Sequence, residues 1–258
     1  MGDETIIMDT ALWGELNTHD PSIIRVDDRY YVFSTDASYG DLHQSGVQVR
    51  VSDDLITWEY LGAAFENYAE ECAEAVAYAG LNTEKGHGFW APDILRHGDG
   101  YRLYFSASTF GSSRSCIALA EADRPEGPYT YKGIVISSEA NAVKNPNCID
   151  PGITVAEDGR MYMVYGSFFG GIFIAELNPD TGFLLEAEEP VRIAGGQHAS
   201  IEGPVIRYLP ETGYYYLFVS YGSLSSDYNI RVARSESITG PYLDAAGNDM
   251  KNLAPGNE

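Results

Sequence analysis

Basic residues are scarce in this sequence. Lysine and arginine together number 16 against 38 aspartate and glutamate residues, which gives a net charge of −22 and an isoelectric point near 4.4. Nucleic-acid binding draws most of its affinity from basic side chains on phosphates, so we expect no nucleic-acid partner. An acidic surface of this kind chiefly supports solubility.

Cysteine is also scarce, and no long hydrophobic run is present. The three cysteines, Cys72, Cys116 and Cys148, are too few and too scattered for a disulfide framework or a zinc site. We interpret them as core thiols of a protein in a reducing compartment. The first residues lack the basic and apolar segments of a signal peptide, and no run approaches a membrane span. The sequence therefore predicts no membrane association and favours a cytoplasmic location, or a secreted one if a signal peptide has been removed.

What the sequence does contain is a repeat. Four stretches share one pattern: an acidic residue or a tryptophan near a proline, a short apolar strand, a polar turn, and a second strand rich in aromatic and aliphatic residues. Each stretch predicts a β-hairpin. The copies begin near residues 20, 91, 150 and 202, and repeats of this size in an all-β chain are typical of a β-propeller. The four hairpins are His19–Thr35, Trp90–Ser106, Asn147–Ser167 and Ile201–Ser220.

Further strands follow each hairpin, so each repeat predicts the four antiparallel strands of one propeller blade. We therefore predict one all-β domain over residues 1–258 with four complete four-stranded blades. Residues 65–86 do not fit the repeat, and their alanine- and glutamate-rich part predicts a short helix inserted between the first two blades. The residues after Tyr242 are too few for another four-stranded blade.

Three acidic residues recur at the start of the repeats. We assign Asp20, Asp150 and Glu202 to one repeat position, and equivalent ends of the inner strands of a propeller converge on one mouth. Carboxylates close together in a cleft acquire different pKa values, which suits the base and the acid of glycoside hydrolysis. The alternative is that each acid only caps a turn or a strand start. Asp93 lies one or two positions out of register and either binds substrate or braces the Trp90-Ala-Pro turn.

The motifs resemble glycoside hydrolase family 43, and the arabinanases within it. Six motifs carry the resemblance, in order and over roughly residues 15–242. The resemblance implies a five-bladed β-propeller whose fifth blade is missing or partial here, and an enzyme that hydrolyses α-1,5-linked L-arabinan with inversion. The motifs are His19-Asp20-Pro21, Trp90-Ala-Pro-Asp93, Ser108-Thr-Phe110-Gly, Ile149-Asp150-Pro151, Gly166-Ser-Phe-Phe-Gly-Gly171 and Ile201-Glu202-Gly-Pro204.

The resemblance also assigns roles to the three acids. Asp20 would be the general base that activates a water, and Glu202 would be the general acid that protonates the leaving oxygen. Asp150 would tune and orient that acid. Inversion implies that the carboxyl groups of Asp20 and Glu202 lie roughly 6.5–9.5 Å apart, which leaves room for the water.

Other residues of these motifs are candidates for contacts with sugar. Trp90, Phe110 and Phe168 could stack on the C–H faces of sugar rings, although aromatic residues also fill small β cores. His19 could donate a hydrogen bond to a sugar hydroxyl or be a structural histidine. Asn147 and Ser167 are candidates of the same kind. These residues and Asp93 form our predicted substrate-binding set.

The resemblance also raises questions of metal, partner and substrate. Arabinanases of this type place a histidine from a Gly-His-Asn segment of the fifth blade on a metal in the central channel. That segment is absent here, so we name no metal ligand and expect no required cofactor, and the central metal ion of the family stays an open alternative. An open blade edge favours association of chains, and we predict a homo-oligomer that covers it.

Three functional readings remain open. The first is an arabinanase, endo-acting, or exo-acting if the 65–86 insertion plugs one end of the groove. The second is an α-L-arabinofuranosidase or β-xylosidase of the same family. The third is a propeller that binds carbohydrate without cleaving it.

Overall fold

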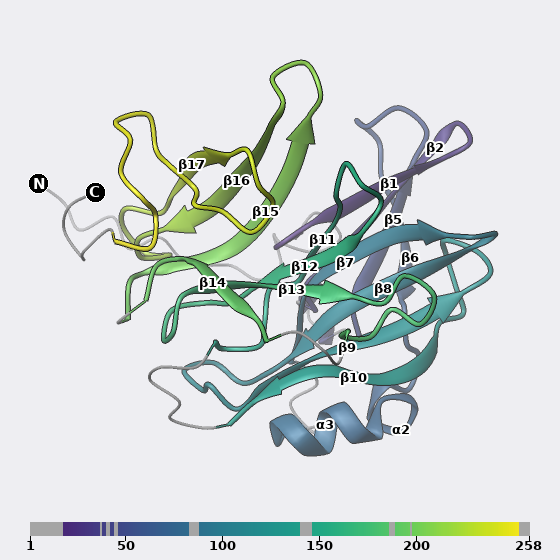
Figure 1. The fold of residues 1–258 in the computed structure, drawn as a ribbon. Coiled ribbons are helices and arrows are strands. Elements are labelled where there is room, and N and C mark those ends of the chain that lie inside the picture. Colours follow the sequence, from purple (N-terminus) through teal and green to yellow (C-terminus); the bar gives the residue numbers. More distant parts are fainter. Residues whose placement is uncertain are drawn as a thin grey trace, which may run out of the picture.

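The computed structural model is an all-β protein with one short helical insertion (Figure 1). It describes residues 18–36, 38–39, 42–43, 46–82, 88–139, 146–185, 189–196 and 198–252. Four antiparallel sheets follow one another along the chain as the blades of a propeller, which confirms the predicted fold class. A small hairpin of two two-residue strands, β3 (Ser38–Tyr39) and β4 (Leu42–His43), projects from the first blade.

Each blade is a meander whose first strand is innermost, and the first three blades have the predicted four strands. Blade 1 contains β1 (Ser22–Val26), β2 (Arg29–Ser34), β5 (Gln48–Ser52) and β6 (Glu59–Ala63). Blade 2 contains β7 (Phe89–His97), β8 (Gly100–Ala107), β9 (Ser115–Ala122) and β10 (Thr130–Ser138). Blade 3 contains β11 (Gly152–Val155), β12 (Met161–Tyr165), β13 (Ile172–Leu177) and β14 (Val191–Ala194).

Blade 4 differs from the predicted four strands. Its sheet has three, β15 (Ile201–Leu209), β16 (Tyr214–Tyr221) and β17 (Asn229–Ser235). In place of an outer strand, Leu243 makes one bridge to Arg234, with two backbone hydrogen bonds of 2.9 Å. Pro241 lacks an N–H for the ladder, and the side chain of Asp244 accepts from the backbone of Ala246 and Asn248, which turns the chain away after one pair.

The predicted helical insertion is present as α2 (Tyr68–Glu71) and α3 (Ala73–Ala79). Helix α3 buries Ala75, Val76 and Ala79 against blade 2 and ends at Gly80 in the left-handed conformation, a common helix stop. The described part of the insertion lies on the outer side of the blades and does not line the central cavity described below. The idea that it plugs one end of the groove is therefore wrong for residues 65–82, and residues 83–86 lie outside the described residues.

The core consists of one cluster at each seam between neighbouring blades. Side chains alternate between the two faces of a strand, so each blade in the middle packs one face on each neighbour. The three clusters join blades 1 and 2, blades 2 and 3, and blades 3 and 4. The other face of blade 4 has no such partner among the described residues. On it, Leu209, Phe218, Ile230 and Val232 are 36%, 38%, 73% and 48% exposed.

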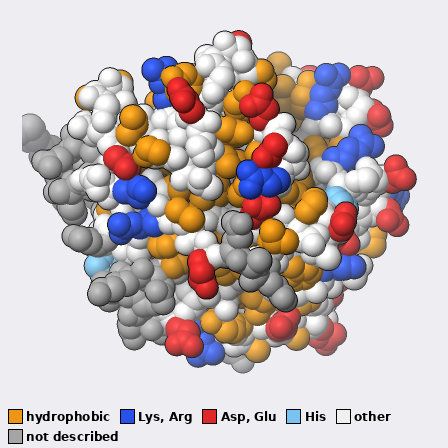
Figure 2. Space-filling model, in the orientation of Figure 1, with side chains coloured by type: hydrophobic (Ala, Val, Ile, Leu, Met, Phe, Trp, Pro, Cys, Tyr) orange, Lys and Arg blue, Asp and Glu red, His pale blue; other side chains and the backbone are white. Residues whose placement is uncertain are grey.

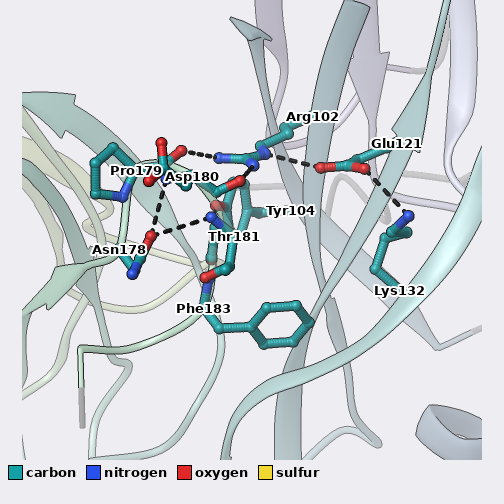
Figure 3. A network of polar contacts seen from close by, with 10 residues as sticks. Arg102, Tyr104, Glu121, Lys132, Asn178, Pro179, Asp180, Thr181 and Phe183 are labelled. Carbon is teal, nitrogen blue, oxygen red and sulfur yellow. Dashed lines mark hydrogen bonds and ion pairs between the residues drawn. The ribbon is translucent and has the colours of Figure 1, made fainter.

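The seam between blades 2 and 3 also has a polar latch, drawn in Figure 3. Arg102 on β8 is only 1% exposed, and its guanidinium donates to Glu121 and to the carbonyl oxygens of Pro179 and Asp180 in the turn after β13. The hydroxyl of Tyr104 donates to the carbonyl of Gly182 in the same turn, at 2.8 Å. The latch therefore ties the middle strands of blade 2 to a turn of blade 3.

The molecular surface agrees with the acidic composition. Figure 2 shows acidic side chains dispersed over the visible face, with hydrophobic side chains between them. None of the helices in the described part of the chain is long and apolar enough to cross a membrane.

Candidate active site

The inner strands β1, β7, β11 and β15 lie side by side in this order and bring their first residues to one end of the molecule. Each strand has a proline near its start, just before β1 and β11 and within the first residues of β7 and β15. The residue before that proline, here called the pre-proline residue, has a left-handed backbone. The pre-proline residues are Asp20 (φ 49°), Ala91 (φ 41°), Asp150 (φ 60°) and Gly203 (φ 59°). For the three that are not glycine this conformation is strained, and such strain gathers at functional sites.

This register corrects one sequence expectation. Asp20 and Asp150 are pre-proline residues, but Glu202 is the residue before one, so the three acids do not share one repeat position. In blade 4 the strained position belongs to Gly203, which adopts a positive φ without a steric penalty. The strand pairing shifts register between Glu202 and Val205, as it does between Trp90 and Asp93 in blade 2.

The three acids nevertheless line one cavity of about 1220 Å³, to which all four blades contribute. Every residue that the sequence predicted for catalysis or substrate binding is on its wall. They are His19, Asp20, Trp90, Asp93, Phe110, Asn147, Asp150, Ser167, Phe168 and Glu202.

Asp20 is the most open of the three acids, with 38% of its side chain exposed. Its Oδ2 accepts hydrogen bonds from His19 Nδ1 at 2.7 Å and from the Thr35 hydroxyl at 2.6 Å. The bond to Asp20, and then the charges of Glu202 and Asp150, raise the pKa of His19. These bonds hold one oxygen of Asp20 in place and leave Oδ1 for a molecule in the cavity.

Asp150 is held from both neighbouring blades. Its backbone N–H donates to the Ser106 hydroxyl of blade 2 at 3.0 Å, and its Oδ2 accepts from the backbone N–H of Gly203 in blade 4 at 2.9 Å. Burial, and then the negative charges of Asp20 and Glu202, raise the pKa of Asp150 well above its ordinary value. This raised pKa favours the protonated form of Asp150.

Glu202 is held by two hydroxyl groups. Ser167, after β12, donates to Oε2 at 3.0 Å, and Tyr228, in the loop before β17, donates to Oε1 at 2.9 Å. A hydroxyl can donate to an ionised carboxylate or accept from a protonated one. The two hydroxyls therefore fix the position of Glu202 in either protonation state.

Asp93 has the contacts of a brace. One carboxylate oxygen accepts from the Ser22 hydroxyl at 2.7 Å, and the other accepts from the backbone N–H of Ile153 at 2.6 Å. The side chain thus joins the inner strands of blades 1, 2 and 3, and burial raises its pKa. Both carboxylate oxygens of Asp93 accept hydrogen bonds from the protein. Of the two roles suggested by the sequence, this supports bracing the structure over binding substrate.

The remaining predicted residues differ in exposure. Phe110 is 90% exposed on the rim, while Trp90 and Phe168 are half-buried. Asn147 is 3% exposed, and its Oδ1 has no hydrogen-bond partner. A buried amide oxygen without a partner on a cavity wall is suited to accept from a hydroxyl of a bound sugar.

Three residues near the acids were missed by the sequence analysis. Thr35 and Ser106 stand at the ends of the second strands of their blades, and Tyr228 stands in a loop. The hydroxyls of Thr35 and Ser106 have a weak signal in the sequence, because both follow a Phe-containing strand end in their repeats. Tyr228 has none, since the loops that join the second and third strands differ in sequence from blade to blade.

The described residues include no group of three or more His, Cys, Asp or Glu side chains arranged to hold a metal ion.

Comparison with known proteins gives a family and a set of relatives. The model of the family described as glycosyl hydrolases family 43 matches residues 14–255. An extracellular endo-α-(1→5)-L-arabinanase of Thermotoga petrophila is 40% identical over 91% of this chain and 52% of its own length. Extracellular endo-α-(1→5)-L-arabinanase 2 of Bacillus subtilis is 40% identical over 94% of this chain and 53% of its own length.

A solved structure agrees with these relatives. The crystal structure of the endo-1,5-α-L-arabinanase from Thermotoga petrophila matches with a TM-score of 0.80 and 39% identity, and covers 91% of this chain and 55% of that one. This chain spans about half the length of the curated relatives that it matches.

Proposed function

Because this chain belongs to glycosyl hydrolases family 43, we propose that it hydrolyses α-1,5-linked L-arabinan with inversion of configuration. The observation that carries the proposal is the set of three carboxylates from three blades on one cavity wall. The three have different surroundings, and such differences are what separate a base from an acid.

In the proposed reaction Asp20 is the base and Glu202 is the acid. A water beside Asp20 attacks the anomeric carbon while Asp20 takes its proton. The bond from that carbon to the leaving oxygen breaks, its electron pair passes to the oxygen, and the oxygen takes the proton of Glu202. After the products leave, solvent returns a proton from Asp20 to Glu202.

Asp150 positions the acid in this proposal. Its carboxylate holds the N–H of Gly203, the residue next to Glu202. Burial, and then the charges of Asp20 and Glu202, raise the pKa of Asp150, which favours its neutral form, and a neutral carboxyl still accepts the hydrogen bond from Gly203. A carbohydrate-binding module would not need this arrangement, so a catalytic role is favoured over binding alone.

The size of the cavity favours a polymer over a single terminal sugar. About 1220 Å³ exceeds the roughly 300–1,000 Å³ of common small-molecule pockets. No described residue of the 65–86 insertion lines the cavity, and the two relatives above are named endo-arabinanases. We therefore propose endo action. The α-L-arabinofuranosidase or β-xylosidase reading remains the second candidate.

Product analysis separates these candidates. The protein is incubated with linear arabinan, and separately with nitrophenyl arabinofuranoside and nitrophenyl xyloside. A ladder of short arabino-oligosaccharides from the polymer supports endo action. Release from the aryl glycosides alone supports the second candidate, and binding without turnover supports a non-catalytic propeller.

Location and association are also proposals. The two arabinanase relatives are named extracellular, so of the two locations left open by the sequence we propose secretion. The exposed apolar face of blade 4 supports the proposal that a second copy of the chain covers it.

A further inference from the structure

A repeated hydrogen bond connects each blade to the strained pre-proline residue of the next. The N–H of Ala91 in blade 2 donates to the Thr35 hydroxyl of blade 1 at 2.9 Å. The N–H of Asp150 in blade 3 donates to the Ser106 hydroxyl of blade 2 at 3.0 Å. The N–H of Gly203 in blade 4 donates to Oδ2 of Asp150 at 2.9 Å.

The first two acceptors occupy the same place in the ladder. Phe33 pairs with Ser22, the residue after the proline of blade 1, and Tyr104 pairs with Asp93, the residue after the proline of blade 2. Thr35 and Ser106 follow two residues later in each case. The hydroxyls of Thr35 and Ser106 thus occupy equivalent positions in blades 1 and 2, so this hydrogen bond is part of the repeat.

Blade 3 has no such hydroxyl for the N–H of Gly203, the residue next to Glu202. Val164 pairs with Gly152, so the equivalent residue is Gly166, which has no hydroxyl. A Cβ at Gly166 would lie only 2.3 Å from the carbonyl oxygen of Gly171, so no larger residue fits there. The carboxylate of Asp150 supplies the missing acceptor instead.

The consequence is a chain of bonds from a buried serine to the acid. Ser106 is 0% exposed and is not on the cavity wall. It holds Asp150, Asp150 holds Gly203, and Gly203 is bonded covalently to Glu202. We propose that Ser106 is a positioning residue for the acid, acting through Asp150. The consequence for catalysis rests on the proposed function.

The physical reason lies in the conformation of Asp150. A non-glycine residue at φ 60° relaxes toward negative φ unless its surroundings prevent it. Without the Ser106 hydroxyl, the N–H of Asp150 has lost its acceptor and the strained conformation has lost its support. Relaxation would move the Asp150 carboxylate away from Gly203.

The test compares Ser106→Ala with Ser106→Thr and with Ser115→Ala. Threonine keeps the hydroxyl, as blade 1 does at Thr35. Ser115 is a matched control, because it is equally buried in blade 2 and its hydroxyl forms a hydrogen bond with the Ser108 hydroxyl, away from Asp150. If Ser106→Ala does not fold, Ser106→Cys replaces it, since a thiol is a weak acceptor of similar size.

Two measurements are made on each variant. The first is the amide NMR signal of Gly203, whose hydrogen exchange we expect to become at least tenfold faster in Ser106→Ala and to be unchanged in Ser106→Thr and Ser115→Ala. The second is turnover of linear arabinan across pH. We expect kcat to fall at least tenfold in Ser106→Ala, because a tenfold change needs about 1.4 kcal/mol, the strength of one hydrogen bond. We expect KM to stay within about twofold and the pH profile of kcat to shift.

The proposal is overturned if the Gly203 signal of Ser106→Ala matches that of the unmodified protein, or if Ser115→Ala changes the signal and kcat equally. If Ser106→Ala loses the hydrogen bond between the Gly203 N–H and Asp150 but keeps its kcat, Ser106 does not position the acid Glu202. If the unmodified protein does not cleave arabinan, the proposed function fails, and the NMR result still decides whether Ser106 holds Asp150.

Discussion

At the scale of single residues, the site depends on how each carboxylate is held. Glu202 accepts hydrogen bonds from Ser167 of blade 3 and Tyr228 of blade 4, so its position depends on two blades. Asp20 is instead fixed by His19 and Thr35 within blade 1. The base and the acid can therefore be perturbed separately.

Tyr228→Phe removes one of the two hydroxyls on Glu202. We expect kcat on linear arabinan to fall by about tenfold, because a hydrogen bond to a charged group stabilises by roughly 1.5–3 kcal/mol and part of this is regained from water. Steady-state kinetics measure the effect. Tyr214→Phe is the control, since its hydroxyl contacts the exposed Glu236 outside the cavity, and a loss of equal size there would contradict the role of Tyr228.

Asp36 links stability to pH. It is 5% exposed, its Oδ2 accepts from the N–H groups of Gly88 and Phe89, and burial raises its pKa to about 7. A raised pKa means that the folded protein prefers the protonated form. The stability that this proton contributes is full below about pH 4 and is lost as the pH rises through 7.

Asp36→Asn should remove this dependence, because the amide stays neutral. Relative to the unmodified protein, the variant should gain free energy of unfolding as the pH rises from 5 to 8, by up to about 3 kcal/mol. Urea unfolding at several pH values measures the difference. The exposed carboxylate of Asp28 gives the control Asp28→Asn, and parallel pH curves for Asp36→Asn and the unmodified protein would refute the prediction.

The sequence could reveal the acids but not their supports. Asp20 and Asp150 stand beside prolines in a visible repeat and Glu202 is two residues from one, and all ten predicted site residues line the cavity. The register of Glu202 was misjudged because Gly203 takes the strained position, which depends on backbone conformation. Ser106 acts across blades and Tyr228 acts from a loop later in blade 4, and no local pattern marks such contacts.

At the scale of elements, the blades are joined by apolar seams and by specific polar contacts. The latch around Arg102 places a buried guanidinium against Glu121 and two backbone carbonyls (Figure 3). A Cβ on Gly182 would lie 2.8 Å from the Tyr104 hydroxyl, so the turn that completes the latch requires glycine. The turn and the strands of blade 2 are thus fitted to each other.

Arg102→Met should lower the free energy of unfolding by about 2–4 kcal/mol, because it leaves two carbonyls and the partly buried Glu121 without their donor. Lys132→Met removes the other cation on Glu121, at 3.3 Å, but that ammonium is exposed, so it should cost below about 1 kcal/mol. Urea unfolding of both variants tests the latch. Equal costs would show that Arg102 adds no more than a surface ion pair.

Most elements were predictable because their patterns are local. The four hairpins alternate apolar and polar residues around polar turns, and the helical insertion has helical spacing. Strand β14 has four residues and offers too short a pattern to recognise. The outer strand of blade 4 was predicted by analogy, but the Asp244 turn ends its pairing after one bridge.

At the scale of the whole molecule, the described blades bury each other at three seams, and the far face of blade 4 carries exposed apolar side chains. In Figure 1 this blade (green to yellow) stands apart from blade 1 (purple to blue), and β1 and β15 are not neighbours in any described sheet. The exposed side chains Phe218, Ile230 and Val232 form an apolar surface on β16 and β17. Such a surface favours association.

We expect a dimer at micromolar concentration by light scattering. Val232→Asp, in the middle of the apolar surface, should shift the protein to the monomer without lowering the turnover of arabinan per chain, since Val232 does not line the cavity. Val155→Asp is a control, because Val155 is exposed at 56% on blade 3, outside this surface. A monomer for the unmodified protein would contradict the prediction.

The whole account depends on one acid and one base from different blades acting on a single bond. The most direct test is the turnover of Glu202→Ala on two substrates. We predict that cleavage of linear arabinan is abolished, while nitrophenyl arabinofuranoside, whose leaving group needs little protonation, retains measurable turnover. Equal loss on both substrates, or retained cleavage of arabinan, would contradict the assignment of Glu202 as the acid.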